Sequence, residues 1–447
     1  MKLKDFIDTV FSLGKKKGFE ECQVHFTRER EFEVHVSRGK VETFKDADSF
    51  AVGFRGLKQG KCGRASVESL DKESAELLVE EAFDNLQVID STDVELFHDG
   101  TGDYRELDYY KGEYERMDSS QKVSFAKELE SHALSLDKRI VMAPRNVFGH
   151  VTSEETIVNT LGLEKEFIND GGYAYTMVLA SDGKVPKSGF RVKVSKTPED
   201  LDVHKIAEEA VQEALALLGA ESVESGKYDV IIRRDVMAEI LGRFSSIFSA
   251  EQVQKKMSPV RGKLGQMIAN PELSIIDDPF IPESFTSRPF DSEGVPTYRK
   301  ALVDKGKLVT YLYDLKTAYK DGVKSTGNAM GSSISMINII LEGEKELPFE
   351  EMLKQVEKGL LIIGVDGLHS GADPISGNFS LGARGFMIEN GEITRPIEQI
   401  TVSGNFVEML TRVKLVGSDR ELNLSMFARA LANVPSVLVG ELDIAGK

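Results

Sequence analysis

The spacing of the apolar residues changes from helical to alternating near residue 20, and this change restricts the fold more than any other feature of the sequence. Between residues 3 and 11, apolar side chains recur at three- and four-residue steps, which predicts a helix that ends at Lys15–Lys17 and Gly18. Beyond it, apolar residues alternate with polar ones at Cys22, Val24, Phe26, Phe32, Val34 and Val36. This alternation predicts two half-buried strands joined by a turn in the polar stretch Thr27–Glu31.

A helix followed by antiparallel strands is predicted a second time in the first half of the chain. Further helices are predicted at Asp71–Leu86, Ser119–Ser135 and Asp202–Leu218. Because 447 residues are too many for one ordinary domain, we expect an N-terminal α+β domain, residues 1–220, of helices packed on an antiparallel sheet. A finer division into helix-plus-sheet subdomains, 1–110 and 111–220, stays open. The polar stretch Glu221–Lys227 is the predicted domain boundary.

The second half, residues 221–447, contains clear hairpin signals. Alternating apolar residues flank Asp304–Lys307 and Asn390–Gly391, and asparagine followed by glycine is a strong two-residue turn. The C-terminal domain is therefore predicted to be mainly antiparallel β with flanking helices. The whole chain is expected to be an α+β protein.

The charge and the cysteine content restrict the partners and the compartment. A net charge of −17 repels nucleic-acid phosphate and anionic lipid, so direct nucleic-acid binding is disfavoured. Cys22 and Cys62 are the two cysteines and form no CxxC motif, which fits a reducing cytoplasm. Asp5 and Asp8 interrupt any apolar core of a signal peptide, and no apolar run reaches the length of a membrane span. A cytoplasmic protein without a membrane segment is expected.

A strand and helix near the middle of the chain would be a rigid support for functional side chains. Tyr228–Ile232 reads as a strand, and Asp235–Ala250 reads as a helix with Asp235 as its N-cap. Glu239 and Arg243 lie four residues apart, which predicts an ion pair on the helix surface. A metal site needs lone-pair donors, and neither alanine at position 238 nor a protonated arginine supplies one. On chemistry alone the helix is therefore predicted to serve in packing, with an ion pair and no catalytic residue.

Two pairs of polar residues have alternative interpretations. His25 and His35 fall on the polar face of the predicted first hairpin, where they could lie opposite each other and begin a metal site; two solvated strand histidines are the favoured interpretation. Asp277 and Asp278 are adjacent acids, but neighbours in an extended chain point in opposite directions, so solvated turn residues are favoured over an acid/base pair.

Two stretches rich in small residues are candidate binding sites for substrate or partner. The loop Lys324–Gly331 offers Ser325, Thr326 and Asn328, and it reads equally well as a plain connector. The stretch that contains Gly371 and Gly377 suits peptide binding by strand addition, or tight turns within a barrel-like sheet. His369, Ser370 and Asp373 are close in sequence there. Local crowding is no evidence for a triad, because triads are assembled between distant segments.

Four ordered motifs resemble the TldD/PmbA family. They are PFDSEGVPT at 289–297, KSTGNA at 324–329, GADPISGNFSLGARGFMIENGEI at 371–393 and ITVSGNFVEML at 400–410. The resemblance extends over essentially the whole chain, weakly before residue 220 and strongly after it. Family membership implies a two-domain α+β protein that acts in pairs and handles peptides or small unstable proteins.

The resemblance also implies a departure from the catalytic members of the family. The resemblance implies that the catalytic members have a zinc-binding His-Glu-x-x-x-His helix after a strand. It also implies a cysteine near their C-terminus. Here the helix motif falls on Ala238, Glu239 and Arg243, and Leu422–Val439 contains no cysteine. The motif is thus vestigial, and no catalytic residue, metal ligand or cofactor is assigned. The departure matches the PmbA branch, also called TldE, whose members are partner subunits without a metal site.

Three functional hypotheses follow. The first is a non-catalytic subunit that pairs with a TldD-type zinc metallopeptidase and helps to hold peptide substrate. The alternative is a self-sufficient hydrolase with a different, non-zinc site that uses His369, Asp373 or Glu239. The third is a homodimeric scaffold with no degradative role.

Overall fold

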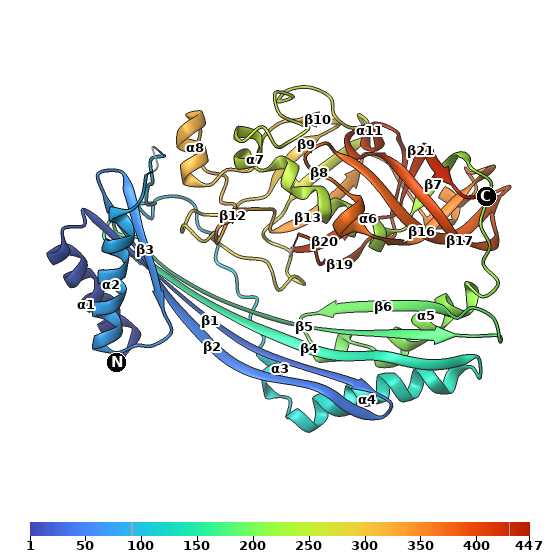
Figure 1. The fold of residues 1–447 in the computed structure, drawn as a ribbon, viewed down its shortest axis with the longest axis horizontal. Coiled ribbons are helices and arrows are strands. Elements are labelled where there is room, and N and C mark those ends of the chain that lie inside the picture. The colour runs from blue at the N-terminus through green and yellow to red at the C-terminus, as the bar shows by residue number, and fades with distance from the viewer. Residues whose placement is uncertain (91–92, 429) are drawn as a thin grey trace.

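The computed structural model describes residues 1–90, 93–428 and 430–447. It is an α+β protein, as the sequence predicts. The N-terminal sheet extends as a long curved layer below the C-terminal strands and helices (Figure 1). Within the described ranges, no helix has the length and the apolar character that are needed to cross a membrane.

The strands of the N-terminal part belong to one sheet. Six strands of the described chain form it in the order β3-β2-β1-β4-β5-β6, and each neighbouring pair is antiparallel. The strands are β1 Glu21–Ser37, β2 Lys40–Lys58, β3 Lys61–Val67, β4 Ile140–Asn159, β5 Glu164–Ala180 and β6 Lys187–Ser195. Strands from before and after residue 110 therefore share a sheet, while the domain boundary near residue 220 stays a prediction.

Two pairs of helices pack on this sheet. Helices α1 Leu3–Lys17 and α2 Lys72–Gln87 lie at one end, and α4 Ser119–Leu136 and α5 Val203–Ala216 lie at the other (Figure 1). The short helices are α3 Glu113–Arg116 and η1 Pro198–Asp200. The predicted end of the first helix is confirmed, since Gly18 ends α1 in the left-handed conformation. The Asp71 and Asp202 side chains accept amide hydrogen bonds as the N-caps of α2 and α5.

The predicted turn at Thr27–Glu31 is wrong, because β1 continues through it. Strands β2 and β4 pair with β1 on both sides of this stretch, and their hydrogen bonds hold the polar residues in extended conformation. Alternate residues of a strand share a face. Val24 therefore faces the core below α1 and α2, and Val34 on the same face belongs to the core below α4 and α5.

The polar stretch lies in the gap between the two helix pairs. Arg28 Nη2 binds Asp48 Oδ2 at 2.6 Å, and Arg30 Nε binds Glu115 Oε1 at 2.7 Å. The polarity of the stretch thus reflects which helices cover the sheet, and not a change of chain direction.

His25 and His35 both lie on β1 and do not face each other, so the predicted opposition across a hairpin is wrong. Neither is a fully solvated residue: both side chains are partly buried, with His25 Nε2 3.5 Å from Glu155 Oε2 and His35 Nε2 3.0 Å from the carbonyl oxygen of Pro144. The two imidazoles therefore do not begin a metal site together.

The C-terminal part contains two larger sheets among the described residues. One has the order β10-β9-β8-β13-β20-β19, and the other has the order β14-β18-β21-β17-β16-β15-β7. The strands of the first are β8 Leu273–Asp277, β9 Lys300–Asp304, β10 Lys307–Leu308, β13 Asn338–Gly343, β19 Glu421–Ser425 and β20 Ala430–Val434. Those of the second are β7 Gly226–Ile232, β14 Glu346–Leu347, β15 Lys358–Asp366, β16 Asn378–Glu389, β17 Glu392–Asn405, β18 Val413–Gly417 and β21 Val437–Ala445.

An additional pairing of β21 with β7 closes β7, β15, β16, β17 and β21 into a ring. The strands β11 Ala329–Met330 and β12 Ser333–Ile334 form a separate small hairpin. The predicted turns at Asp304–Lys307 and Asn390–Gly391 are confirmed by the β9–β10 and β16–β17 pairs. The helices of this part are α6 Arg234–Phe244, η2 Ser245–Phe248, α7 Ala250–Gln254, α8 Leu315–Asp321, α9 Phe349–Leu353, α10 Leu368–Gly371 and α11 Phe406–Thr411.

Candidate functional site at helix α6

Helix α6 follows strand β7 directly, and its start is fixed by an ion-pair network. The helix begins at Arg234, and Asp235 is not its N-cap, so that prediction is wrong. Arg233 binds the Asp235 carboxylate with both Nε and Nη2, at 2.6 and 2.7 Å, and binds Glu213 Oε2 on α5 at 2.6 Å. Both oxygens of the Asp235 carboxylate are thus bound by Arg233 in a bidentate, charge-assisted pair.

The predicted ion pair between Glu239 and Arg243 does not form. Arg243 Nε donates to the carbonyl oxygen of Leu368 at 3.0 Å, and its Nη2 donates to that of Ala372 at 2.7 Å. Both acceptors lie at the short helix α10, where carbonyl oxygens lack partners within the helix. A cationic side chain that donates to such carbonyl oxygens in a partly buried place contributes more to the free energy of unfolding than a solvated surface ion pair does.

Glu239 lies at a small cavity beside the helix. The cavity has a volume of ≈ 170 Å³ and is lined by Glu239, Arg191 and Arg384, among others. Glu239 Oε1 accepts a long hydrogen bond from the amide of Met426 at 3.4 Å, whereas Oε2 is buried without a hydrogen-bond partner in the described part of the chain. Burial raises the pKa of the Glu239 carboxyl to about 7.

The zinc that the family implies does not fit these residues. Ala238 is fully buried and ends in a methyl group, and Arg243 is fixed to two carbonyl oxygens. Among the three motif residues, Glu239 is then the one whose side chain could donate a lone pair to a metal ion. Over the described residues, no group of three or more His, Cys, Asp and Glu side chains lies close enough together to hold a metal ion.

The candidate residues of the 324–331 loop have structural partners. Thr326 and Asn328 are buried, and Ser325 is partly buried. Ser325 Oγ donates to the carbonyl oxygen of Tyr313 at 3.0 Å, and Thr326 Oγ1 accepts from the amide of Tyr313 at 2.7 Å. The loop is therefore held closely against the segment that precedes α8.

Asp277 corrects another prediction, because it is not a solvated turn residue. It ends strand β8 and is fully buried. Its Oδ2 accepts from Lys300 Nζ at 3.0 Å and from Asn328 Nδ2 at 2.7 Å. The candidate Asn328 thus supports a buried acid–lysine pair.

The glycines at 371 and 377 serve the local backbone. A Cβ at Gly371 would lie 2.3 Å from the carbonyl oxygen of Ser380, and Gly377 has a φ of +82°. Nearby, Asp373 accepts from Ser376 Oγ at 2.7 Å, Ser370 Oγ donates to Gly367 at 3.4 Å, and the His369 side chain is exposed. The structure therefore does not bring His369, Ser370 and Asp373 together as a triad.

Sequence reasoning missed a buried pair of acids in the 289–297 motif. Asp291 accepts hydrogen bonds from the amides of Glu293, Val295 and Ala329 at 2.9–3.0 Å. Glu293 Oε1 lies 3.8 Å from Nη1 of Arg55 on strand β2, so the pair joins the two parts of the molecule. Burial raises the pKa of both carboxyls. The sequence motif contains both acids, but no local pattern within it predicts that they are buried.

Three family models match consecutive parts of the chain. They describe domain 1 of the PmbA/TldA metallopeptidases over residues 22–86, the central domain over 112–218 and the C-terminal domain over 225–446. The curated Metalloprotease PmbA of Escherichia coli O157:H7 is 26% identical over 462 residues, which cover 100% of this chain and 96% of the relative.

Solved structures agree over the whole length. The structure of a candidate modulator of a DNA gyrase from Thermotoga maritima is 40% identical, with a TM-score of 0.93 over 99% of this chain and 100% of that one. TldE from Thermococcus kodakarensis is 24% identical, with a TM-score of 0.90 over 99% of this chain and 100% of that one, and it supports the fold alone. From these matches over its full length, we conclude that the chain belongs to the PmbA/TldD metallopeptidase family.

Proposed function

We propose that this chain is a non-catalytic subunit that pairs with a metal-bearing TldD-type subunit in the breakdown of peptides or small unstable proteins. The observation that carries the proposal is the side-chain set on α6. The Ala238 side chain has no lone pair, and the Arg243 guanidinium, which has donors but no acceptor, donates to two carbonyl oxygens. Zinc, where a catalytic member binds it, lowers the pKa of a bound water, and Glu239 has no such water to activate here.

The names of similar proteins support this proposal in part. The relative from Escherichia coli is called a metalloprotease, and the structural relative from Thermococcus kodakarensis is called TldE. Membership of a metallopeptidase family together with an altered metal motif favours a partner role within a peptidase. The cytoplasmic location predicted from the sequence is part of this proposal.

The test uses the full chain, alone and with a TldD-type chain from the same source. Elemental analysis of the isolated chain should find no stoichiometric zinc, and peptide hydrolysis should be absent. Light scattering after co-purification should give the mass of a mixed complex with peptidase activity. A zinc-loaded, active isolated chain would contradict the proposal. A stable self-pair that does not accept a TldD-type chain would favour the homodimeric scaffold instead.

A self-sufficient hydrolase is the second candidate, and one observation favours it. Glu239 lines a cavity and has a pKa of about 7, which suits a general acid or base near neutral pH. If the isolated chain hydrolyses peptides, Glu239→Gln should reduce the rate by about 10²–10⁴-fold. The same loss in His369→Ala instead would assign the role to His369.

A further inference from the structure

One half of strand β5 has an open edge. Strand β5 pairs with β4 from Glu164 to Ala180, but it pairs with β6 only from Gly172 to Ala180. Its first half, residues 164–171, therefore has no strand on the β6 side in the described structure. An unpaired edge presents amide and carbonyl groups that can pair with another extended chain.

The direction of the free groups follows from Asp170. Its amide donates to Asn169 Oδ1, and its carbonyl oxygen accepts from the ammonium group of Lys196, which follows β6. The backbone groups of Asp170 thus point away from β4. Because hydrogen-bonding direction alternates along a strand, those of Glu164, Glu166 and Ile168 point the same way. No hydrogen bond to these outward groups is found among the described residues.

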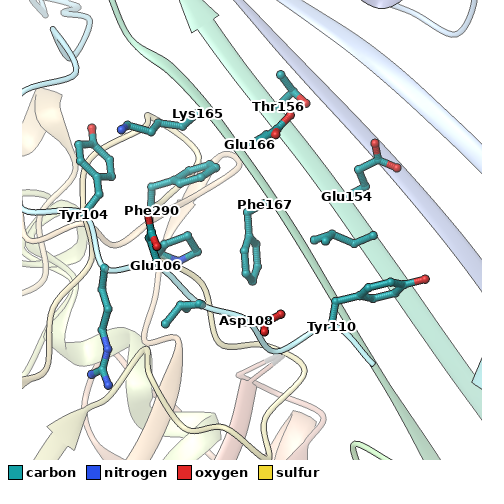
Figure 2. A pocket seen from close by; sticks show the side chains of 14 residues that line it. Tyr104, Glu106, Asp108, Tyr110, Glu154, Thr156, Lys165, Glu166, Phe167 and Phe290 are labelled. Atoms are coloured by element: carbon teal, nitrogen blue, oxygen red, sulfur yellow. The ribbon is translucent and has the colours of Figure 1, made fainter. Parts of the chain in front are cut away.

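The open edge borders the large cavity drawn in Figure 2. This β5 cavity has a volume of ≈ 630 Å³ and is bounded by residues 165–168 of β5 and by residues 104–108 and 110 of the connector between α2 and α3. Tyr104 and Lys165 lie at one end of it, and Tyr110 lies at the other (Figure 2).

The connector frames the cavity without closing it. At one end, Tyr104 donates its hydroxyl to the carbonyl oxygen of Gly294 at 2.6 Å. At the other end, the amides of Lys111 and Gly112 donate to the Asp170 carboxylate at 3.0 and 2.7 Å. Between these anchors the connector makes no backbone hydrogen bond to β5 in the described chain. The connector and the open edge thus border the same cavity without backbone hydrogen bonds between them.

The charges around the cavity favour a basic occupant. Its lining includes the acids Glu106, Asp108 and Glu166, and also Glu154, which lies 3.7 Å from Nη1 of Arg30. The two basic residues of the lining lie against aromatic rings: Lys165 Nζ is 4.0 Å from the ring centre of Tyr104, and the Arg105 guanidinium carbon is 4.8 Å from that of Phe280. Phe167 and Phe290 add apolar surface.

We propose that the open edge of β5 binds an extended peptide with alternating basic and apolar side chains, by strand addition along residues 164–168. Main-chain hydrogen bonds supply the affinity in this mode, and side-chain pockets supply the preference. The site goes beyond the proposed pairing and does not depend on it, because it is complete within one chain.

The first experiment measures binding to the full chain without a partner. The probe is a fluorescein-labelled octapeptide of alternating lysine and valine, read by fluorescence anisotropy. A version with every backbone amide N-methylated keeps the charges but has no amide donors, so its binding should be at least 10-fold weaker. A glutamate–valine version should also bind more weakly. Equal binding of the methylated and unmethylated lysine peptides would overturn strand addition.

The second experiment changes the protein. Ile168→Pro removes one outward amide without removing a bond to β4, and should weaken binding roughly 2- to 10-fold, whereas Ile168→Val keeps the amide and should bind as the wild type does. The double variant Glu106→Gln/Glu166→Gln should weaken binding of the lysine peptide, and the exposed Glu350→Gln, on α9, should not.

The outcomes separate this proposal from the pairing. A folded Ile168→Pro chain that binds like the wild type would contradict the proposal, and if that variant does not fold, the N-methylated probe decides. Pairing is measured as the mass of a complex in the absence of peptide. The peptide-binding proposal can therefore be contradicted while the pairing proposal stands, and the pairing proposal can be contradicted while peptide binding stands.

Discussion

Arg243 donates from Nε to the carbonyl oxygen of Leu368 at 3.0 Å, and this bond ties helix α6 to helix α10. A second donation, to the carbonyl oxygen of Ala372 at 2.7 Å, completes the attachment. The position for which the family resemblance implies a zinc ligand is therefore used here for packing two helices together. Arg243 and Ala238, the two motif positions without a metal ligand, affect the stability of the fold, and the burial of the Glu239 and His150 side chains makes it dependent on pH.

Arg243→Ala should destabilise the fold. The carbonyl oxygens of Leu368 and Ala372 lose charged donors, which is expected to lower the free energy of unfolding by about 2–4 kcal/mol in urea denaturation. Arg412 is the control, because its side chain is 41% exposed, its ion pair with Glu408 is 3.7 Å long, and its hydrogen bond to the carbonyl oxygen of Glu441, at 3.2 Å, is exposed to solvent. Arg412→Ala should change the stability by less than about 1 kcal/mol. Equal losses in the two variants would contradict a special role for Arg243.

Ala238→His should be poorly tolerated, although it restores a residue of the family's zinc motif. The Ala238 side chain is fully buried in the core, and inserting an imidazole there should lower the free energy of unfolding by about 1–3 kcal/mol or more. Ala216→His, at an exposed position of α5, should lower it by less than about 1 kcal/mol. Thermal or urea unfolding of both variants makes the comparison. A stable Ala238→His chain would show that the helix keeps room for a ligand.

Glu239 should make the stability of the fold dependent on pH. Its pKa is about 7 in the folded chain, against about 4.3 when unfolded, so the folded state binds the proton more tightly. The stabilisation that comes from protonating this carboxyl in the folded state is therefore fully present below pH ~4. It is lost as the pH rises to ~7 and above. Glu239→Gln should remove this loss and gain up to about 3 kcal/mol relative to the wild type at pH 8, with little difference at pH 4.5. Urea denaturation at the two pH values tests this, and a difference that does not change with pH would contradict it.

His150 should remain neutral well below the usual range. It is buried between the rings of Phe32 and Tyr114, each with a centre 5.8 Å away, and Lys122 Nζ lies 2.8 Å from its Nε2. Burial and the Lys122 charge lower the pKa of His150 to about 4. Because the unfolded value is about 6.5, stability is lost as the pH falls from ~6.5 towards 4.

The measurement for His150 is an NMR titration of the imidazole C–H signal, assigned by its loss in His150→Gln. The signal should show no titration between pH 7.5 and 5.5, where a histidine in a short peptide titrates with a pKa of about 6.5. A midpoint near 6.5 in the folded protein would show that the ring is accessible to water and that the buried stack opens.

Local signals in the sequence predicted local structure well. The Asn390–Gly391 turn and the ends of α1, α2 and α5 depend on residues within a few positions of each other, so their chemistry is complete in the sequence. The alternation of Cys22, Val24 and Phe26 likewise identified a strand. The resemblance to the TldD/PmbA family, carried by four ordered motifs, was confirmed by matches along the chain.

Predictions failed where polar residues have partners in other segments of the chain. Thr27–Glu31 was expected to turn, but pairing with β2 and β4 on both sides holds it extended. Asp277 was expected in solvent, but Lys300 and Asn328 bind it in the core. These partners are selected by the packing of the whole molecule, and no short window contains them.

By itself, the sequence determined that this is an acidic α+β chain of the PmbA/TldD family whose helix motif lacks two metal-ligand types, because residue type alone decides whether a lone pair exists. Only the tertiary structure decided that Arg243 binds carbonyl oxygens and not Glu239, that Asp291 and Glu293 are buried together, and that half of β5 has an open edge. Each of these depends on distances between segments far apart in the chain, and such distances are fixed only when the sheets and helices pack.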